Sequence, residues 1–319
     1  FDYVFDTDFA ADLTIMEEGT EMLDRIARFM KGDKSVKLPI MTSCCPGWVN
    51  FFETNYPDML DIPSTAKSPM QMFGAIAKNY WAEKMGIKRE DLVVVSIMPC
   101  VAKKYECQRD EFKVDGNPDV DYSLTTRELA DMIKLLGVKF EDLEDSDFDR
   151  PLGESTGAAV IFGATGGVIE AATRTAYEIF TKKELGTELR GLEGVREATV
   201  DFDGTPIHIG IAHGLGNARK LLDKVRSGEE QFHAIEIMAC PGGCVGGAGQ
   251  PYHHGDFSKV EKRLAAIYEE DRERPLRKSH ENPYIQQLYK EYLGEPCGEK
   301  AHHLLHTHYF DKSEKKFGI

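Results

Sequence analysis

The sequence predicts an α/β protein in which strands alternate with helices and pair mostly in parallel. Three short apolar runs rich in β-forming residues, at 37–41, 92–98 and 234–238, each end at a loop that contains cysteine. Between these runs, apolar residues recur at helical spacing. Because ligands in such folds collect at the carboxyl ends of strands, we expect the cysteine loops to form the functional site.

The individual elements follow from periodicity and charge placement. Residues 12–29 carry apolar side chains at helical spacing, with acidic residues early and Arg25 and Arg28 late, as the helix dipole favours. Four more segments show helical patterns: 68–84, 126–136, 168–180 and 217–225. A further strand is expected at 207–212. Residues 113–150 and 181–204 are rich in turn-forming and charged residues, so we expect them to wrap the surface.

Length, charge and cysteine content exclude several classes of protein. A chain of 319 residues can bury one large core or two smaller ones. The net charge of −15 disfavours nucleic acid and anionic membranes, and no run approaches the roughly 18 apolar residues of a membrane span. Seven cysteines are an odd number for a disulfide framework, so we interpret them as thiolates in a reducing, cytoplasmic compartment. The chain begins at Phe1, so a removed leader and a periplasmic location stay open.

The three cysteine loops share a high content of glycine and proline. Residues 42–48 read TSCCPGW, residues 98–106 read MPCVAKKYE, and residues 238–251 read MACPGGCVGGAGQP. Such loops hold the backbone close to a bulky group, with amide N–H groups available to sulfur or an anion. A structural zinc site usually shows two short cysteine pairs, whereas Cys240 and Cys244 form the only short pair here. Four thiolates from separate loops suit a cubane iron–sulfur cluster at least as well as zinc.

Cys44 and Cys45 are adjacent, and two neighbouring thiolates cannot both easily reach one metal. One is therefore expected to be a ligand while the other has a different role. Taken alone, the pair is equally well explained as two small buried residues. Cys107 and Cys297 lack glycine-rich surroundings and are interpreted as free thiols.

Three other motifs carry weaker signals. Residues 214–219, GLGNAR, resemble a dinucleotide fingerprint, but Arg219 stands where a third glycine or alanine is needed. Residues 163–167, GATGG, lack the Lys of a P-loop, and a tight turn before a helix explains them. A cluster of histidines near the end could bind metal, but a solvated helix end facing a partner is the favoured interpretation. Its members are His302, His303, His306 and His308.

With the three loops assembled, the sequence resembles the catalytic domain of FeFe (iron-only) hydrogenases. The signatures TSCCPGW, MPCxxKxxE and MACxxGCxxGGGQP are specific in combination, and only Ala248 departs from the third. The resemblance runs from about Phe5 to Tyr309. It implies two lobes, each a small, mostly parallel sheet flanked by helices, with the metal cluster at their interface. We expect the first lobe at 1–150, the second at 151–258 and a helical C-terminal extension at 259–319, with the upstream iron–sulfur domains of relatives absent from this segment.

The resemblance implies an H-cluster, a 4Fe-4S cubane joined to a two-iron subcluster that carries CO, cyanide and an azadithiolate. Its cubane ligands would be Cys45, Cys100, Cys240 and Cys244, with Cys244 bridging to the two-iron unit. Residues around the two-iron unit would be Lys103 at a cyanide, Ser68 near another ligand, and an apolar wall of Met98, Met238 and Phe162. Where the family often has glutamine two residues after Ser68, this chain has Met70 followed by Gln71.

Cys44 would then exchange protons with the azadithiolate amine, through a relay formed by Glu18, Ser64 and Glu21. The two glutamates are three residues apart, so a helix places them on one face. From the residues alone, both could instead be carboxylates favoured by a helix N-terminus.

The resemblance implies a hydrogenase that reversibly reduces protons to hydrogen. Its electrons would come from ferredoxin or from a partner subunit linked to NAD or formate, in a hetero-oligomer without nucleic acid or membrane insertion. The alternative is a hydrogen-sensing protein or an iron–sulfur scaffold with little turnover. The presence of Cys44, which sensory relatives commonly lack, favours the enzyme.

Overall fold

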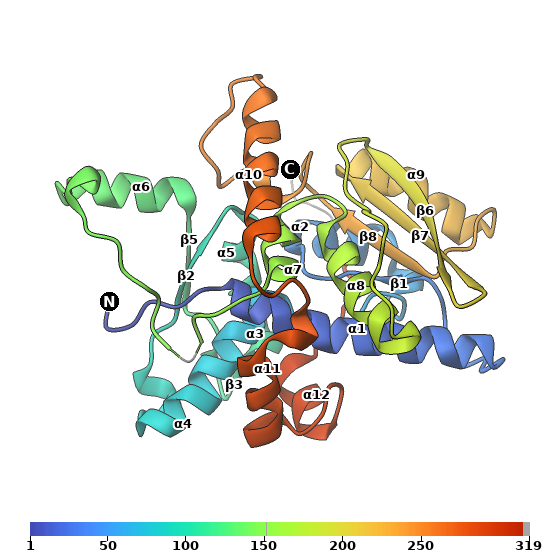
Figure 1. Ribbon diagram of the computed structural model, residues 1–319, viewed down its shortest axis with the longest axis horizontal. Coiled ribbons are helices and arrows are strands. Elements are labelled where there is room, and N and C mark those ends of the chain that lie inside the picture. The colour runs from blue at the N-terminus through green and yellow to red at the C-terminus, as the bar shows by residue number, and fades with distance from the viewer. Residues whose placement is uncertain (151, 315–319) are drawn as a thin grey trace.

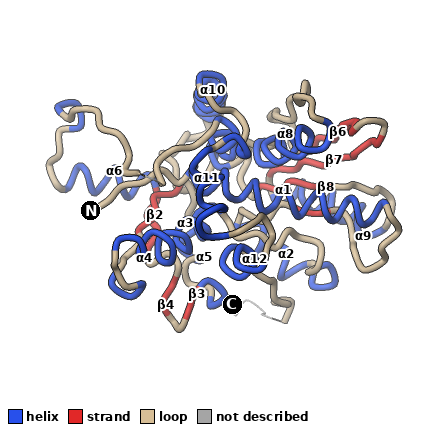
Figure 2. The backbone as a smooth tube through the Cα atoms, turned by 60° about the horizontal axis from the view of Figure 1, so that its bottom comes forward, coloured by secondary structure: helices blue, strands red, loops and turns tan. Residues whose placement is uncertain are grey.

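The computed structural model describes residues 1–150 and 152–314, which form an α/β arrangement with helices on both faces of the larger sheet (Figures 1 and 2). The longer helices are α1 (Asp8–Met30), α2 (Pro46–Asn55), α3 (Pro69–Ile76), α6 (Thr126–Leu135), α8 (Gly167–Thr181), α9 (Leu215–Ser227) and α10 (Ser258–Glu273). The shorter ones are α4 (Ala82–Met85), α5 (Ala102–Glu106), α7 (Gly157–Val160), α11 (Pro283–Leu288) and α12 (Glu299–Leu305). None of these helices has the combination of length and apolar character that a membrane crossing requires.

The larger sheet has four strands in the order β1 (Ile40–Met41), β8 (Ala234–Met238), β7 (Thr205–His213) and β6 (Val195–Phe202). The β1–β8 and β8–β7 pairs are parallel, while β6 and β7 form an antiparallel hairpin. A second sheet pairs β2 (Val95–Met98) in parallel with β5 (Tyr122–Thr125). A short antiparallel pair joins β3 (Lys113–Val114) and β4 (Asn117–Pro118). Mostly parallel small sheets flanked by helices confirm the predicted fold class.

The alternation of side chains in β7 explains why the larger sheet has two buried faces. Ile209 and Ile211 point to the face covered by α1 and α8, whereas Ala212 points to the face covered by α2 and α9. On this second face Trp48 of α2 is fully buried. Burying a side chain of this size stabilises the fold by about 2–3 kcal/mol.

Helix α1 lies along the middle of the molecule and contacts both α3 and α8 (Figure 1). From Phe9 to Ile15 every one of its residues is buried, so this half is a core helix rather than an amphipathic surface helix. Phe9 and Leu13 pack with α3 and the C-terminal helices, while Ile15 and Met22 pack against the larger sheet and α8. Helix α1 therefore connects α3 and the C-terminal helices to α8 and the larger sheet.

The predicted helices and strands are found, but two segments expected to wrap the surface also contain strands. Within 113–150 the chain forms β3, β4 and β5, and β5 pairs in parallel with β2. Residues 195–202 were expected to be surface turn but form strand β6, so that prediction was wrong. Polar residues alternate through this strand, whose outer edge is unpaired within the described chain, and this composition hides it. Strand β1 of the first half pairs with β8 of the second, so the larger sheet draws on both predicted lobes. The predicted C-terminal extension runs into 315–319, which lie outside the described residues.

Candidate active site

All three cysteine loops begin at the carboxyl ends of parallel strands. Cys44 and Cys45 follow β1, Cys100 follows β2, and Cys240 follows β8. Cys45 caps the N-terminus of α2, with Pro46 in the first helical position. The cysteines therefore come from the carboxyl ends of strands in both sheets, where ligands collect in such folds.

Direct backbone contacts hold these loops together. The amide of Gly249 donates to the carbonyl of Pro99 over 2.9 Å, which joins the third loop to the second. A Cβ atom at Gly249 would lie 2.6 Å from the carbonyl carbon of Pro99, and one at Gly247 would lie 2.3 Å from its oxygen. Any larger residue would separate the loops, so glycine is required at both positions.

The four predicted ligand cysteines are each half-buried, and they influence one another's pKa. Burial raises the pKa of Cys45 to about 11, and the nearby charges of Cys100 and Cys240 raise it further. Burial, followed by Cys45, Cys100 and Cys240, also raises the pKa of Cys244. Cys45 and Cys244 therefore remain protonated at neutral pH unless a cation holds them as thiolates, which is the behaviour of a metal site.

The spacing of the thiols distinguishes a cluster from a single ion. In a tetrahedral zinc site with zinc–sulfur bonds of about 2.3 Å, the ligand sulfurs are about 3.8 Å apart. Among residues 1–150 and 152–314, two groups of three possible ligand atoms lie within 4.8 Å of one another, and neither contains these four cysteines. Within the described residues the cysteines are thus close enough to affect one another's pKa, and no three of their sulfurs lie within 4.8 Å of one another. This arrangement fits the larger cubane.

Cys44 lies beside this thiol group and faces a carboxylate. Burial raises its pKa well above the usual value, and Glu18 followed by Cys244 raises it further, while Lys103 lowers it. Cys44 packs against the apolar cluster that contains Met238 and Phe162. A neutral thiol in such surroundings is suited to carrying a proton rather than to binding metal.

Lys103 and Ser68, both predicted to contact the cofactor, are joined by Glu106, which the sequence reasoning did not single out. Lys103 Nζ donates to Glu106 Oε2 over 2.7 Å and to the Cys44 carbonyl over 3.0 Å. Ser68 Oγ donates to the same carboxylate oxygen over 3.1 Å. Burial opposes the charge of Lys103, but Glu106 and the neighbouring thiols raise its pKa overall. The signal for Glu106 was its spacing of three residues after Lys103 in the second signature.

The predicted relay residues are close together in the structure. Glu18 Oε1 accepts from the Ser43 amide over 3.2 Å, and Ser64 Oγ donates to Glu21 Oε2 over 2.7 Å. Burial raises the pKa of Glu18 to about 8, Glu21 adds to the rise, and the bonds from Ser43 and Ser64 oppose it. Glu18 Oε2 has no partner within the described chain.

Glu18 and Glu21 do not lie at a helix N-terminus, so the alternative explanation from the helix dipole was wrong. Helix α1 begins at Asp8, which puts both glutamates several turns into it. The sequence reasoning also overlooked Arg25, which contacts Glu21 Oε1 at 2.5 Å. Its spacing of four residues from Glu21 on the same helix was the available signal.

The remaining predicted site residues form apolar surroundings. Met98 and Met238 are buried and Phe162 is half-buried. Met70 is buried beside Met98, and its sulfur accepts from Ser96 Oγ at 3.1 Å. Gln71 is fully buried, and neither of its amide atoms has a partner within the described residues.

The weaker sequence motifs have structural explanations. The turn after β7 is fixed by the Gly214 amide, which donates to Met238, and the turn before α8 places Gly166 at φ 88°. One histidine prediction was wrong, because His306 does not lie at a solvated helix end. It is buried, and its Nε2 lies 2.9 Å from Glu17 Oε2.

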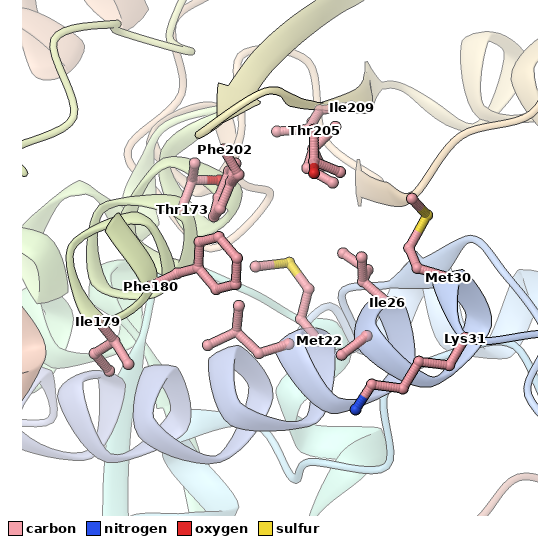
Figure 3. Close-up of a pocket in the computed structure, with 13 residues that line it drawn as sticks. Met22, Ile26, Met30, Lys31, Thr173, Ile179, Phe180, Phe202, Thr205 and Ile209 are labelled. Atoms are coloured by element: carbon pink, nitrogen blue, oxygen red, sulfur yellow. The ribbon is translucent and has the colours of Figure 1, made fainter. Parts of the chain in front are cut away.

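A separate apolar cavity of about 510 Å³ lies away from the thiols (Figure 3). It is bounded by the second half of α1, the end of α8 and the β6–β7 hairpin, with Met22, Phe180 and Phe202 among its walls. No cysteine, carboxylate or histidine lines it, so it is unsuited to acid–base or metal chemistry.

Two family models together cover most of the chain. Residues 1–248 match the model described as the iron-only hydrogenase large subunit, C-terminal domain. Residues 257–312 match the model described as the iron hydrogenase small subunit.

Individual relatives agree with these matches. The chain is 64% identical over 316 residues to the NADP-reducing hydrogenase subunit HndD of Solidesulfovibrio fructosivorans, covering 98% of this chain and 54% of that protein. It is 42% identical over 317 residues to iron hydrogenase 1 of Clostridium pasteurianum, covering 97% and 54%. The chain thus spans about half the length of these two curated relatives.

A solved structure supports the same assignment. The structure of HydA that revealed stepwise assembly of the FeFe-hydrogenase H-cluster matches with a TM-score of 0.86 and 44% identity, covering 98% of this chain and 85% of that one. The chain therefore belongs to the iron-only, or FeFe, hydrogenase family.

Proposed function

We propose that this chain catalyses the reversible reduction of protons to hydrogen at an H-cluster. The observation that carries the proposal is the position of Cys44, a half-buried thiol next to Cys244 on one side and to the buried carboxyl of Glu18 on the other. A structural iron–sulfur site needs its ligand thiols but has no use for a neutral fifth thiol connected to buried carboxyl groups.

Four cysteines would hold the cubane: Cys45, Cys100, Cys240 and Cys244. Cys244 would be shared with the two-iron subcluster, and Met98, Met238 and Phe162 would exclude water around it. When bound, this group supplies the electrons and the iron site at which hydrogen is made or split.

Lys103 would anchor an anionic ligand of the subcluster. Its ammonium group has three N–H donors, and two of them are used by Glu106 and the Cys44 carbonyl. The third is available to a cyanide, while Ser68 fixes the Glu106 carboxylate that orients the lysine.

Protons would move between Cys44 and the surface through Glu18, Ser64 and Glu21. Because its pKa is raised to about 8, Glu18 is mostly protonated at neutral pH and can give a proton to a Cys44 thiolate. The Ser64 hydroxyl donates to Glu21 and can pass a proton from Glu21 towards Glu18 by taking one as it releases another. Arg25 holds the Glu21 carboxylate at the outer end of this path.

We further propose that electrons enter through the cubane from iron–sulfur clusters outside this segment, in a hetero-oligomer. The source would be ferredoxin or a partner subunit linked to NAD or formate. Because ferredoxins are acidic and this chain has a net charge of −15, a dedicated subunit or a local basic patch would have to mediate docking. We propose residues 1–150, 151–258 and 259–319 as two lobes and an extension, in a cytoplasmic protein.

The test is hydrogen evolution from reduced viologen after the cubane-loaded protein has been matured with a synthetic two-iron complex. Cys44→Ala should abolish the activity while iron content stays at the wild-type level. Cys107→Ala is the matched control and should evolve hydrogen, because it removes a buried thiol that packs beside Met98 but belongs neither to the proposed ligands nor to the proposed relay.

Negligible turnover of the wild type with an assembled cluster would contradict the proposed enzyme and favour the hydrogen sensor or iron–sulfur scaffold. Zinc instead of iron in anaerobically purified protein would contradict the cluster itself.

A further inference from the structure

A second group of buried polar residues, the His306 branch, lies against the outer end of the proposed relay. It consists of Thr65, His306 and Glu17. His306 Nδ1 lies 2.7 Å from Thr65 Oγ1, and His306 Nε2 lies 2.9 Å from Glu17 Oε2. The Thr65 hydroxyl also reaches Glu21 Oε1 over 3.2 Å. A continuous line of polar atoms therefore runs from Glu21 to Glu17.

The backbone fixes this geometry. Residues 65–67 run antiparallel to residues 305–307, with Lys67 N donating to Leu305 O over 2.8 Å and Thr307 N donating to Thr65 O over 2.7 Å. This pairing places the Thr65 hydroxyl beside the His306 ring. The side chains of His306 and Glu17 are only 2% and 0% exposed, so water cannot replace their bonds to each other.

The hydrogen bonds of the His306 branch are compatible with two arrangements that differ by one proton. The contact between His306 Nε2 and the Glu17 carboxylate requires a proton on Nε2, because both atoms are otherwise acceptors. Thr65 has one hydroxyl proton. If Thr65 donates to Glu21, His306 Nδ1 must also carry a proton, and the ring is an imidazolium. If Thr65 donates to Nδ1, the ring is neutral.

We propose that the His306 branch stores a proton and exchanges it with Glu21 through the Thr65 hydroxyl. The proton on His306 Nδ1 passes to Thr65 Oγ1 as the Thr65 hydroxyl proton passes to Glu21 Oε1. His306 becomes neutral, Glu21 becomes a carboxylic acid, and no further reactant is needed. This inference rests on the proposed function, because it gives the relay a local proton supply at the point where it meets the surface.

The groups that face His306 come from four parts of the chain. Helix α1 supplies Glu17 and, across Thr65, Glu21 with its Arg25 partner. His302 of α12 stacks on the ring with centroids 4.4 Å apart, Tyr289 donates to Glu17 Oε1, and the Cys297 amide donates to Glu17 Oε2 over 2.8 Å. Two carboxylates and one neighbouring arginine leave net negative charge around the ring.

A metal ion is the competing occupant, because Glu17, Cys297 and His306 bring three possible ligand atoms within 4.8 Å. Both oxygens of Glu17 already accept hydrogen bonds, and Cys297 Sγ donates to the Glu17 carbonyl over 3.3 Å. Because these ligand atoms are already in use, we assign the cluster to proton storage rather than to a metal.

The first experiment measures viologen-driven hydrogen evolution between pH 6 and pH 9 in the matured protein. Thr65→Val removes the hydroxyl that connects His306 to Glu21. We expect at most about a threefold loss at pH 6, where protons are plentiful, and roughly a tenfold loss at pH 8.5 and above. Thr65→Ser should restore the wild-type pH profile. Thr307→Val serves as the control, because it removes a nearby hydroxyl whose one hydrogen bond within the described residues is to the His308 carbonyl.

The second experiment does not depend on turnover. In the oxidised, cubane-loaded protein labelled with ¹⁵N-histidine, His306 should give the nitrogen shifts of an imidazolium at pH 7, and Glu17→Gln should convert it to the neutral form. A neutral His306 in the wild type from pH 6 to pH 9, or zinc that Cys297→Ala removes, would overturn the inference.

The two experiments also separate the inference from the proposed function. If the wild type evolves hydrogen and Thr65→Val has the same pH profile as the wild type, proton storage by the His306 branch is contradicted. The proposed hydrogenase activity is then unaffected. If the wild type evolves no hydrogen, the proposed function fails, and the nitrogen shifts still decide whether His306 holds the proton.

Discussion

Two buried carboxyl groups in this protein, Glu18 and Asp271, have opposite surroundings. Glu18 is 3% exposed, accepts from the Ser43 amide, and leaves one oxygen without a partner within the described chain. Asp271 is fully buried and accepts hydrogen bonds from three arginines, Arg174, Arg190 and Arg277. Burial raises the pKa of Glu18 to about 8, whereas at Asp271 the arginines outweigh burial and lower the pKa.

The difference shows that partners, rather than burial, decide what a buried acid does. Asp271 keeps its charge and connects α10 to α8 and to the loop that carries Arg190. It thereby joins the segment that matches the small-subunit family to the segment that matches the large-subunit family. Glu18 lies where its charge is poorly compensated, so it can gain and lose a proton near neutral pH.

The largest effect on hydrogen evolution is expected from removing the titratable carboxyl of Glu18. Glu18→Gln keeps the shape and the bond from Ser43 but cannot carry a proton onward. Hydrogen evolution should fall by roughly 10²–10⁴-fold, the range of a lost proton-transfer group. The measurement is viologen-driven hydrogen evolution, with iron content determined on the same sample.

Glu83→Gln, an exposed glutamate on α4, is the control for the same chemical change. If Glu18→Gln evolved hydrogen at the rate of that control, Glu18 would be a structural acid like Asp271.

The second largest effect, that of replacing Asp271, should appear in the free energy of unfolding and not in the rate of hydrogen evolution. Asp271→Ala removes the carboxylate that all three arginines share, although Arg174 and Arg190 keep Glu170 as a second partner. Breaking a buried ion pair from one side costs about 3–5 kcal/mol in the free energy of unfolding. Urea unfolding of the metal-free chain should show this loss, while hydrogen evolution per folded, matured molecule stays near the wild-type rate.

Glu273→Ala, an exposed residue on the same helix, should cost less than about 1 kcal/mol. An equally small cost for Asp271→Ala would mean that the arginines find other partners, and Asp271 would no longer represent a structural connection.

The sequence was informative about the thiol site because short local patterns specify it. The cysteines of the three signature loops lie in glycine-rich or proline-rich loops that follow strands, and the carboxyl ends of parallel strands lie at the same edge of a sheet. Glu18 and Glu21 could be placed on one helix face from their spacing alone. Helix spacing also held the signals for Arg25 and Glu106, which were available but not used.

The interactions that the sequence did not reveal join residues far apart in the chain. His306 and Glu17 are separated by 289 positions, and Arg190 and Asp271 by 81. Nothing in the local pattern around either partner identifies the other, because the contact exists only after the helices have packed. Strand β6 was missed for a related reason, since its pairing with β7 and not its composition makes it a strand.

The smallest effect, a difference in pH dependence, tests the comparison most directly. The pKa of Glu18 rises from the ordinary glutamate value of 4.5, which applies in the unfolded chain, to about 8 in the folded chain. Between these values the folded state binds more protons than the unfolded state, so the free energy of unfolding falls as pH rises through this window. Between pH 6 and pH 8 this fall amounts to about 2 kcal/mol.

Asp271 should show the opposite behaviour, because its pKa is lowered from the ordinary aspartate value of 3.8. Its stabilising contribution is complete above that ordinary value and is lost as pH falls below it. Urea unfolding of the metal-free chain at several pH values should therefore show Glu18→Gln gaining stability relative to the wild type from pH 6 to pH 8. The deficit of Asp271→Ala should stay constant over that range and shrink in acid. Parallel curves for the wild type and Glu18→Gln would mean that Glu18 is ionised in the folded protein, and the proposed relay would lose its neutral donor.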